Sequence, residues 1–183
     1  MIRPTVLVPL DGSHSDTQTI DQVARLLSAQ DPRFVLARVV GPEEIREKLA
    51  LLNFIETGNG ADEGLSSLER TTTEAMQQAG MNMADTCKAL GRQGFACRTV
   101  IELGDPIRSI VGMAEREEVD LIALSNNLHA EQASTQSIAS VPRHVVALAQ
   151  QSVLVLRTTH DKSEDDDRSL HWQPFQEKQP WNL

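Results

Sequence analysis

Residues 5–13 read Thr5-Val6-Leu7-Val8-Pro9-Leu10-Asp11-Gly12-Ser13, an apolar run that ends in a glycine turn. The shortness of the run and its β-branched residues favour a buried strand over a helix. Behind the turn, apolar residues recur at the i, i+3, i+4 and i+7 spacing of an amphipathic helix, at Ile20, Val23, Ala24 and Leu27. Strand, turn and helix in this order predict the first half of a βαβ unit.

Four further apolar runs predict buried strands along the chain. They are Phe34–Val40, Cys97–Glu102, Val119–Leu124 and Ser152–Leu156. Segments with helical apolar spacing separate them, and strands that alternate with helices are joined by right-handed crossovers into a mostly parallel sheet. We therefore predict an α/β, doubly wound domain of five strands with helices on both faces.

Two predicted helices follow the second strand in succession. Apolar residues indicate a helix over 43–55, and the glycine-containing stretch 57–60 ends it. A long helix is predicted over 65–92, because apolar residues such as Met83 and Leu90 keep one of its sides apolar. After the third strand, Gly104-Asp105-Pro106 predicts a helix start with Asp105 as the N-cap residue and Pro106 in the first turn.

The length and composition fit one domain with a tail. Of the 183 residues, 40% are hydrophobic, which is typical of a globular protein with a proper core. We assign this domain to residues 1–157. The remainder, 158–183, contains the run Asp161-Lys162-Ser163-Glu164-Asp165-Asp166-Asp167-Arg168, which has no apolar side chain to bury. We expect it to be a solvated, flexible acidic tail.

Charge and hydropathy exclude two classes of partner. The formal net charge of −9 repels a phosphate backbone, so nucleic acid is not expected to bind. No apolar run approaches the roughly 18 residues of a membrane-spanning helix. Residues 1–4 do not lead into the hydrophobic region of a signal peptide. We therefore expect a cytoplasmic protein without membrane insertion.

The two cysteines, Cys87 and Cys97, lie in unlike sequence contexts. They form no CxxC pair, and no histidine stands at the spacing of a zinc site, so no metal is expected. We interpret both as buried, unpaired thiols, which is the common state of a free cysteine in a core. A redox role for either one is the alternative.

Asp11 directly follows the first predicted strand, and in an open parallel sheet ligands collect at the carboxyl ends of strands. Its carboxylate could accept hydrogen bonds from an amine or hydroxyl of a ligand. It could equally satisfy backbone amides at the start of the following helix, as Asp and Ser do at such turns. The residues alone leave both roles open.

Three motifs in their order and spacing resemble the universal stress protein (UspA) family. They are Pro9-Leu10-Asp11-Gly12-Ser13-His14-Ser15, Gly104-Asp105-Pro106 before an Ile-rich helix, and Val119-Asp120-Leu121-Ile122 before a polar loop. The resemblance covers about residues 3–157, with an atypical segment at 41–65. It implies strand order 3-2-1-4-5 and a dimer, and the family divides into members that bind ATP and members that do not.

The ATP-binding branch of that family carries a Gly-x2-Gly-x9-Gly-Ser/Thr loop after the fourth strand, whose glycines let the backbone approach the phosphates. Here Ser125, Leu128 and Ala139 stand in place of the three glycines, with one residue too many between the anchors, and only Ser140 matches. The Leu128 side chain would occupy space that a triphosphate needs. The resemblance therefore implies a degenerate site without tight ATP binding.

Other cofactor-binding positions of the family are retained. Asp11 matches the acidic residue near the adenine, and Val39 matches the second-strand residue whose backbone meets the base. With Ser140 they form the candidate set for cofactor binding, with an adenosine-like ligand such as AMP or ATP as the possible occupant. No cofactor, no metal ligand and no catalytic residue is otherwise expected.

The resemblance and the residues together predict a cytoplasmic stress-response protein that acts by association with other proteins and not by catalytic turnover. The last strand, Ser152–Leu156, is apolar, and an apolar edge strand favours a symmetric homodimer. An unidentified protein partner completes this hypothesis. The alternatives are a sensor that binds ATP or AMP and a weak nucleotide hydrolase.

Overall fold

A computed structural model describes residues 3–13, 15–55, 64–126 and 140–158. The chain folds into a five-stranded sheet of order β3-β2-β1-β4-β5. Every neighbouring pair of strands is parallel, as the alternation of strands and helices predicts. The strands are β1 (Thr5–Leu10), β2 (Arg33–Val40), β3 (Ala96–Leu103), β4 (Leu121–Asn126) and β5 (Ser152–Arg157). The predicted fold class and strand order are confirmed.

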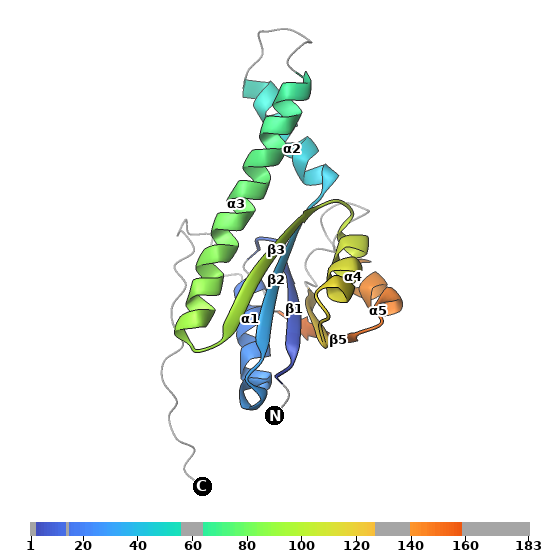
Figure 1. Ribbon diagram of the computed structural model, residues 1–183. Coiled ribbons are helices and arrows are strands. Elements are labelled where there is room, and N and C mark those ends of the chain that lie inside the picture. The colour runs from blue at the N-terminus through green and yellow to red at the C-terminus, as the bar shows by residue number, and fades with distance from the viewer. Residues whose placement is uncertain (1–2, 14, 56–63, 127–139, 159–183) are drawn as a thin grey trace.

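Helices cover both faces of this sheet (Figure 1). On one face lie the helices α1 (Ser15–Leu26) and α3 (Gly64–Arg92), and on the other lie α4 (Pro106–Arg116) and α5 (Ser140–Leu148). A 3-10 turn, Ser28–Gln30, links α1 to β2, and α2 (Pro42–Ile55) precedes α3. The predicted helices 43–55 and 65–92 are confirmed to within one residue at their starts.

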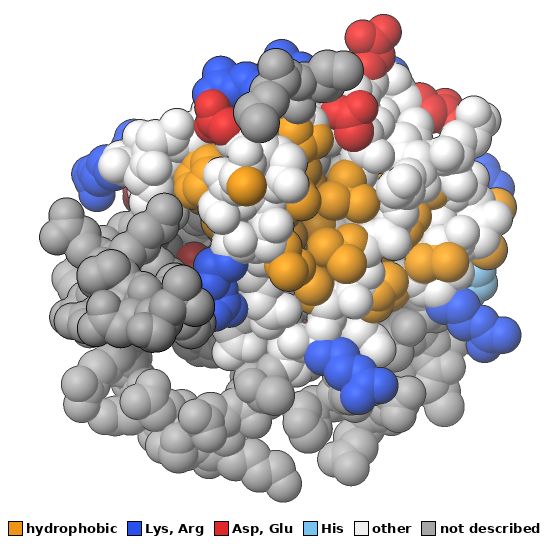
Figure 2. Space-filling model, turned by 90° about the horizontal axis from the view of Figure 1, so that it is seen from below, with side chains coloured by type: hydrophobic (Ala, Val, Ile, Leu, Met, Phe, Trp, Pro, Cys, Tyr) orange, Lys and Arg blue, Asp and Glu red, His pale blue; other side chains and the backbone are white. Residues whose placement is uncertain are grey.

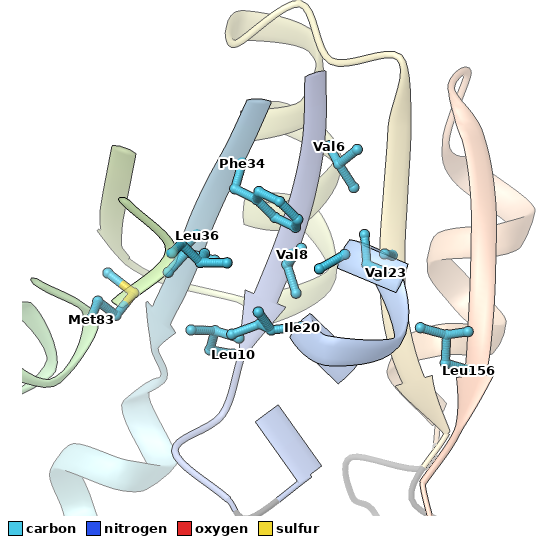
Figure 3. Close-up of a cluster of buried hydrophobic side chains, with 12 residues drawn as sticks. Val6, Val8, Leu10, Ile20, Val23, Phe34, Leu36, Met83 and Leu156 are labelled. Atoms are coloured by element: carbon cyan, nitrogen blue, oxygen red, sulfur yellow. The ribbon is translucent and has the colours of Figure 1, made fainter. Parts of the chain in front are cut away.

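Side chains of the central strand alternate between the two layers of the core. Val6 and Val8 pack toward α1 and α3, and Leu7 packs toward α4 and α5. All three are fully buried. Figure 3 shows the first of these layers, where side chains of β1, β2 and α1 meet Met83 of α3 and Leu156 of β5. This burial on both faces explains why the strand reads as a continuous apolar run.

The fourth strand begins two residues later than the sequence indicates. Val119 is buried, but the turn before it contains Glu118 at φ 49°, and the pairing with β5 starts at Leu121. Asp120 is held at the start of β1, because its N–H donates to the carbonyl of Thr5 and its carboxylate accepts the N–H of Thr5 at 2.7 Å. Asp120 therefore connects the two strands at their amino ends.

The start of α4 confirms the prediction from Gly104-Asp105-Pro106. Asp105 is the N-cap residue, and its Oδ1 accepts the backbone N–H of Arg108 at 2.9 Å. Pro106 occupies the first helical position, where its missing N–H costs nothing.

The prediction of two unpaired thiols is wrong. Cys87 of α3 and Cys97 of β3 form a disulfide, with their Cα atoms 5.4 Å apart. The sequence separates them by ten residues, but a turn around Gly94, at φ 91°, returns the chain so that the strand lies against the helix. The periodic apolar pattern of each element cannot show this juxtaposition, because it depends on the turn between them.

The helices α2 and α3 form an arm that extends past the carboxyl ends of the strands (Figure 1). At its base a small separate core contains Val40, Ile45 and Ala75. The opposite end of the molecule, viewed in Figure 2, has hydrophobic side chains gathered in its middle and charged side chains around them. The predicted acidic tail, beyond Thr158, lies outside the described residues.

Phe34 offers the sharpest test of the core. Its ring is 1% exposed and lies edge-to-face against Phe95, with ring centroids 5.4 Å apart. Phe34→Ala should lower the free energy of unfolding by about 3–5 kcal/mol, because it leaves a cavity between two layers. Urea unfolding followed by circular dichroism measures this.

Leu103→Ala is the control, since Leu103 is 53% exposed at the end of β3 and its truncation should cost about 0.5 kcal/mol or less. A loss below about 1 kcal/mol in Phe34→Ala would contradict the assigned core.

Candidate functional site

The candidate site lies at the carboxyl ends of β1, β2 and β4. The strand order reverses beside β1, because the chain continues from β1 to β2 on one side and β4 lies on the other. In open parallel sheets this reversal opens a crevice for ligands. The turn after β1 and the end of β4 are therefore the segments from which a site can be built.

The backbone N–H groups of the turn between β1 and α1 donate hydrogen bonds to nearby carboxylates. Gly12 has φ 87°, a left-handed conformation that suits glycine and permits the tight turn. The carboxylate of Asp16 accepts the N–H of Asp11 at 3.2 Å and the N–H of Gly12 at 2.8 Å. Oδ1 of Asp11 accepts the N–H of Ser13 at 2.8 Å. Three successive amides thus have acidic partners within the turn.

Asp11 is exposed, and its carboxylate stabilises the turn before α1. The amide it accepts belongs to Ser13, whereas α1 begins at Ser15, so this hydrogen bond does not cap the helix. The sequence left two roles open for Asp11, ligand binding and capping of the following helix. In the structure Asp11 accepts a backbone N–H, but this N–H belongs to the turn and not to the helix. Its exposure keeps the carboxylate in reach of a ligand.

Asp16 is a site residue that the sequence analysis missed. Burial, and after it the neighbouring carboxylate of Asp11, raises the pKa of Asp16 to about 7, from an ordinary value of 3.8. The hydrogen bonds from Gly12 and Asp11 act in the opposite direction and do not cancel the effect. The available signal was an acidic residue in the first turn of the helix that follows the Asp11-Gly12-Ser13 turn.

Three serine hydroxyls join the turn to the end of β4. Oγ of Ser13 lies 2.6 Å from Oγ of Ser15, and Ser15 lies 3.3 Å from Oγ of Ser125. Ser15 is buried, and Ser125 belongs to β4, where it stands in place of the first glycine of the family loop. The three hydroxyls are hydrogen-bonded to one another, and these bonds hold the turn against the end of β4.

Arg38 brings a positive charge to the carboxyl end of β2. Its Nη1 donates to the carbonyl of Leu10 at 3.3 Å, and its Nη2 pairs with Glu44 of α2 at 2.8 Å. Lys48 also pairs with Glu44, at 3.2 Å. Glu44 therefore pairs with the positive charge of Arg38, which would otherwise be available to an anionic ligand.

Val39 is buried in the layer of α4 and α5, so its side chain belongs to the core. The register of β1 with β2 ends at Arg38, and Val39 pairs onward with Glu102 of β3. Val39 thus lies past the end of β1, at the carboxyl edge of the sheet. Asp11 and Val39 are brought to the same end of the sheet, as expected.

Ser140 is the first residue of α5. The loop before it, with Leu128 and Ala139, lies outside the described residues, and so does His14. Over the described part of the chain, no three His, Cys, Asp or Glu residues gather in a way that could hold a metal ion. None of the described helices is long and apolar enough to cross a membrane.

A family model places the chain among known proteins. Residues 3–157 match the model of the universal stress protein family. The match spans most of the 183 residues and includes all five strands. The chain belongs to the universal stress protein family.

Individual relatives agree with this assignment. The universal stress protein Rv1636 of Mycobacterium tuberculosis is 23% identical over 155 residues, which are 85% of this chain and 97% of that protein. The solved structure of hypothetical protein MJ0577 is 21% identical, with a TM-score of 0.65 over 88% of this chain and all of that one. UspA of Lactobacillus plantarum gives 20% identity and a TM-score of 0.61, over 86% and 100%. The two structures establish a shared fold.

Asp16 predicts a pH dependence of stability. With a pKa of 3.8 in the unfolded chain and about 7 in the fold, Asp16 holds its proton more firmly when folded. Stability should therefore fall as the pH rises from about 4 to about 7. Asp16→Asn, which keeps a carbonyl oxygen as acceptor, should make this fall shallower. Urea unfolding at pH 5, 6, 7 and 8 measures it.

A residual slope is expected, because burial also raises the pKa of Asp21. Asp85→Asn on the exposed side of α3 is the matched control and should retain the wild-type slope. Identical slopes in wild type and Asp16→Asn would show that the Asp16 carboxyl is not responsible.

Proposed function

We propose that this chain acts in the stress response as a cytoplasmic homodimer that associates with a protein partner, without tight ATP binding and without catalytic turnover. Residues 1–157 form the acting domain, and 158–183 form an acidic appendage. The observation that carries the proposal is the occupation of the turn amides of Asp11, Gly12 and Ser13 by carboxylates. Successive turn amides that lack such partners can donate to an anionic group of a ligand.

The charges of the described site support the same proposal. Asp11, Asp16 and Glu44 lie at the carboxyl edge of the sheet, and Glu44 pairs with both Arg38 and Lys48. Above the pKa of Asp16, which is about 7, three carboxylates stand against two cations. A triphosphate brought to this edge would then meet more negative than positive charge and would have to displace an ion pair. In the adjoining loop sequence, Leu128 replaces a family glycine.

A sensor of adenosine-like ligands is the second candidate. It is favoured by the exposure of Asp11 and by the course of Val39 past the end of β1. A base could lie on these residues without using the occupied amides. Ser140, at the start of α5, would then take the part of the phosphate-binding serine of the family.

Calorimetric titration tests ATP binding. Wild-type protein with ATP and magnesium should bind more weakly than about 1 mM. Asp16→Ala frees the amides of Asp11 and Gly12 and removes a negative charge, so it should bind ATP more tightly than wild type does. Asp85→Asn, far along α3, should match wild type.

Micromolar binding of ATP to the wild type would overturn the proposal. AMP titrated in parallel separates the second candidate: micromolar AMP binding that Asp11→Ala abolishes would establish the sensor in its place.

The proposed dimer uses the edge of β5. Among the described residues, β5 pairs with β4 alone, which leaves one row of backbone groups for a second strand. Val155 of β5 is 39% exposed, and Val146 and Leu148 of the adjacent α5 are more exposed still. An apolar edge beside an exposed apolar helix face fits a self-complementary contact between two copies.

Val155→Lys tests this contact. The exposed position tolerates the longer side chain in the monomer, but the symmetric contact would bring two ammonium groups together. Sedimentation velocity should show a wild-type dimer and a shift of Val155→Lys toward monomer. Leu103→Lys, at the end of the opposite edge strand β3, is the matched control and should remain dimeric. A monomeric wild type, or an unaltered Val155→Lys dimer, would refute the β5 interface.

A further inference from the structure

The disulfide between Cys87 and Cys97 lies away from the proposed ligand site and joins two elements of different kinds. Cys87 belongs to the last turns of α3, and Cys97 is the second residue of β3, an edge strand. Both residues are half-buried. Both side chains pack against the edge of the core and keep part of their surface in solvent. An exposed disulfide is more readily attacked by a small thiol than one sealed in a core.

Apolar contacts also hold together the two elements that the disulfide joins. Met83, Ala89 and Leu90 of α3 are each at most 5% exposed, so apolar burial holds this helix on the sheet. The turn between the two elements closes through its own backbone, since the N–H of Phe95 donates to the carbonyl of Leu90 at 3.1 Å. The dithiol form should therefore keep the same architecture.

The strand β3 has further attachments that the helix lacks. Eight successive residues of β3 pair with β2, from Ala96 with Arg33 to Leu103 with Val40. On the other face, Arg98 pairs with Glu117 and Glu102 pairs with Arg116. Opening of the disulfide should consequently loosen the end of α3 and leave β3 in the sheet.

We propose that Cys87 and Cys97 form a reversible thiol–disulfide site, oxidised by a low-molecular-weight disulfide and reduced by a dithiol, which controls how firmly the last turns of α3 are attached to β3. This site is independent of nucleotide binding and of the dimer. In a compartment that keeps thiols reduced, disulfides are characteristically transient and redox-sensing. A disulfide can open and close reversibly where other contacts keep the fold together, as the burial of α3 and the pairing of β3 do here.

The chemistry balances by two thiol–disulfide exchanges. A thiolate of the dithiol attacks one sulfur, forms a mixed disulfide and releases the other cysteine as a thiolate, which takes up a proton. The second thiol of the reductant then attacks the mixed disulfide, the remaining cysteine leaves as a thiolate and takes up a proton, and the reductant departs as its own disulfide. The protein gains two electrons and two protons. In oxidation, one cysteine thiolate attacks glutathione disulfide and releases one glutathione, and the other cysteine thiolate then attacks the mixed disulfide and releases the second glutathione.

The test is a redox titration of the full chain in buffers of reduced and oxidised glutathione, followed by alkylation and mass measurement. The native protein should change from no alkylated cysteine to two as the buffer becomes reducing. Hydrogen exchange measured at both ends of the titration should show amides of residues 86–92 about tenfold faster in the reduced form. Amides of α4 should be unchanged and serve as the internal reference.

The double variant C87S/C97S is the matched control. It should show the fast exchange at 86–92 in every buffer and no response to the glutathione ratio. If the variant does not fold, the wild-type titration still tests the proposal by itself. The proposal fails if the cysteines stay alkylatable in the most oxidising buffer, or if the bond resists reduction in the native protein. It also fails if exchange at 86–92 is the same in both states.

Discussion

The central position of β1 is the constraint on which the rest of the structure depends. Its backbone pairs with β2 on one side and β4 on the other, and its side chains are buried in both layers of the core. A strand in this position is predominantly apolar, and its polar turn comes where the sheet ends. Asp11, Gly12 and Ser13 therefore lie at the carboxyl edge because β1 is buried up to Leu10.

The same constraint explains why the turn after β1 is self-contained. Three amides leave the sheet together with no strand to pair with, and backbone N–H groups outside a ladder take side chains or water as partners. In this chain the carboxylates of Asp11 and Asp16 accept them. That arrangement brings two acidic groups together, and with burial it holds the pKa of Asp16 near 7. The local solution for the backbone thus sets the electrostatic character of the candidate site.

Sequence patterns predicted the elements well where the apolar period was strong. The strands β1 and β2, the long helix α3 and the Asp105 cap all lie where the pattern indicated. The start of β4 was placed two residues early, because Val119 is buried without being in the strand. For the candidate site, Asp11 was predicted from its place after the first strand and Val39 from the family resemblance. Asp16 and Arg38 were not predicted, since their roles depend on hydrogen bonds made across the turn and from β2 to α2.

By itself, the sequence determined the class of fold, the order of its elements and the family, because these follow from local period, turn residues and short motifs. The tertiary structure decided which side chains meet. It joined Cys87 to Cys97, placed Ser15 against Ser125 and paired Arg38 with Glu44. The physical reason is that hydrophobic burial follows a repeating pattern, which can be read along the chain. Disulfides, hydroxyl clusters and ion pairs instead depend on distances of a few ångströms between segments that only the completed fold brings together.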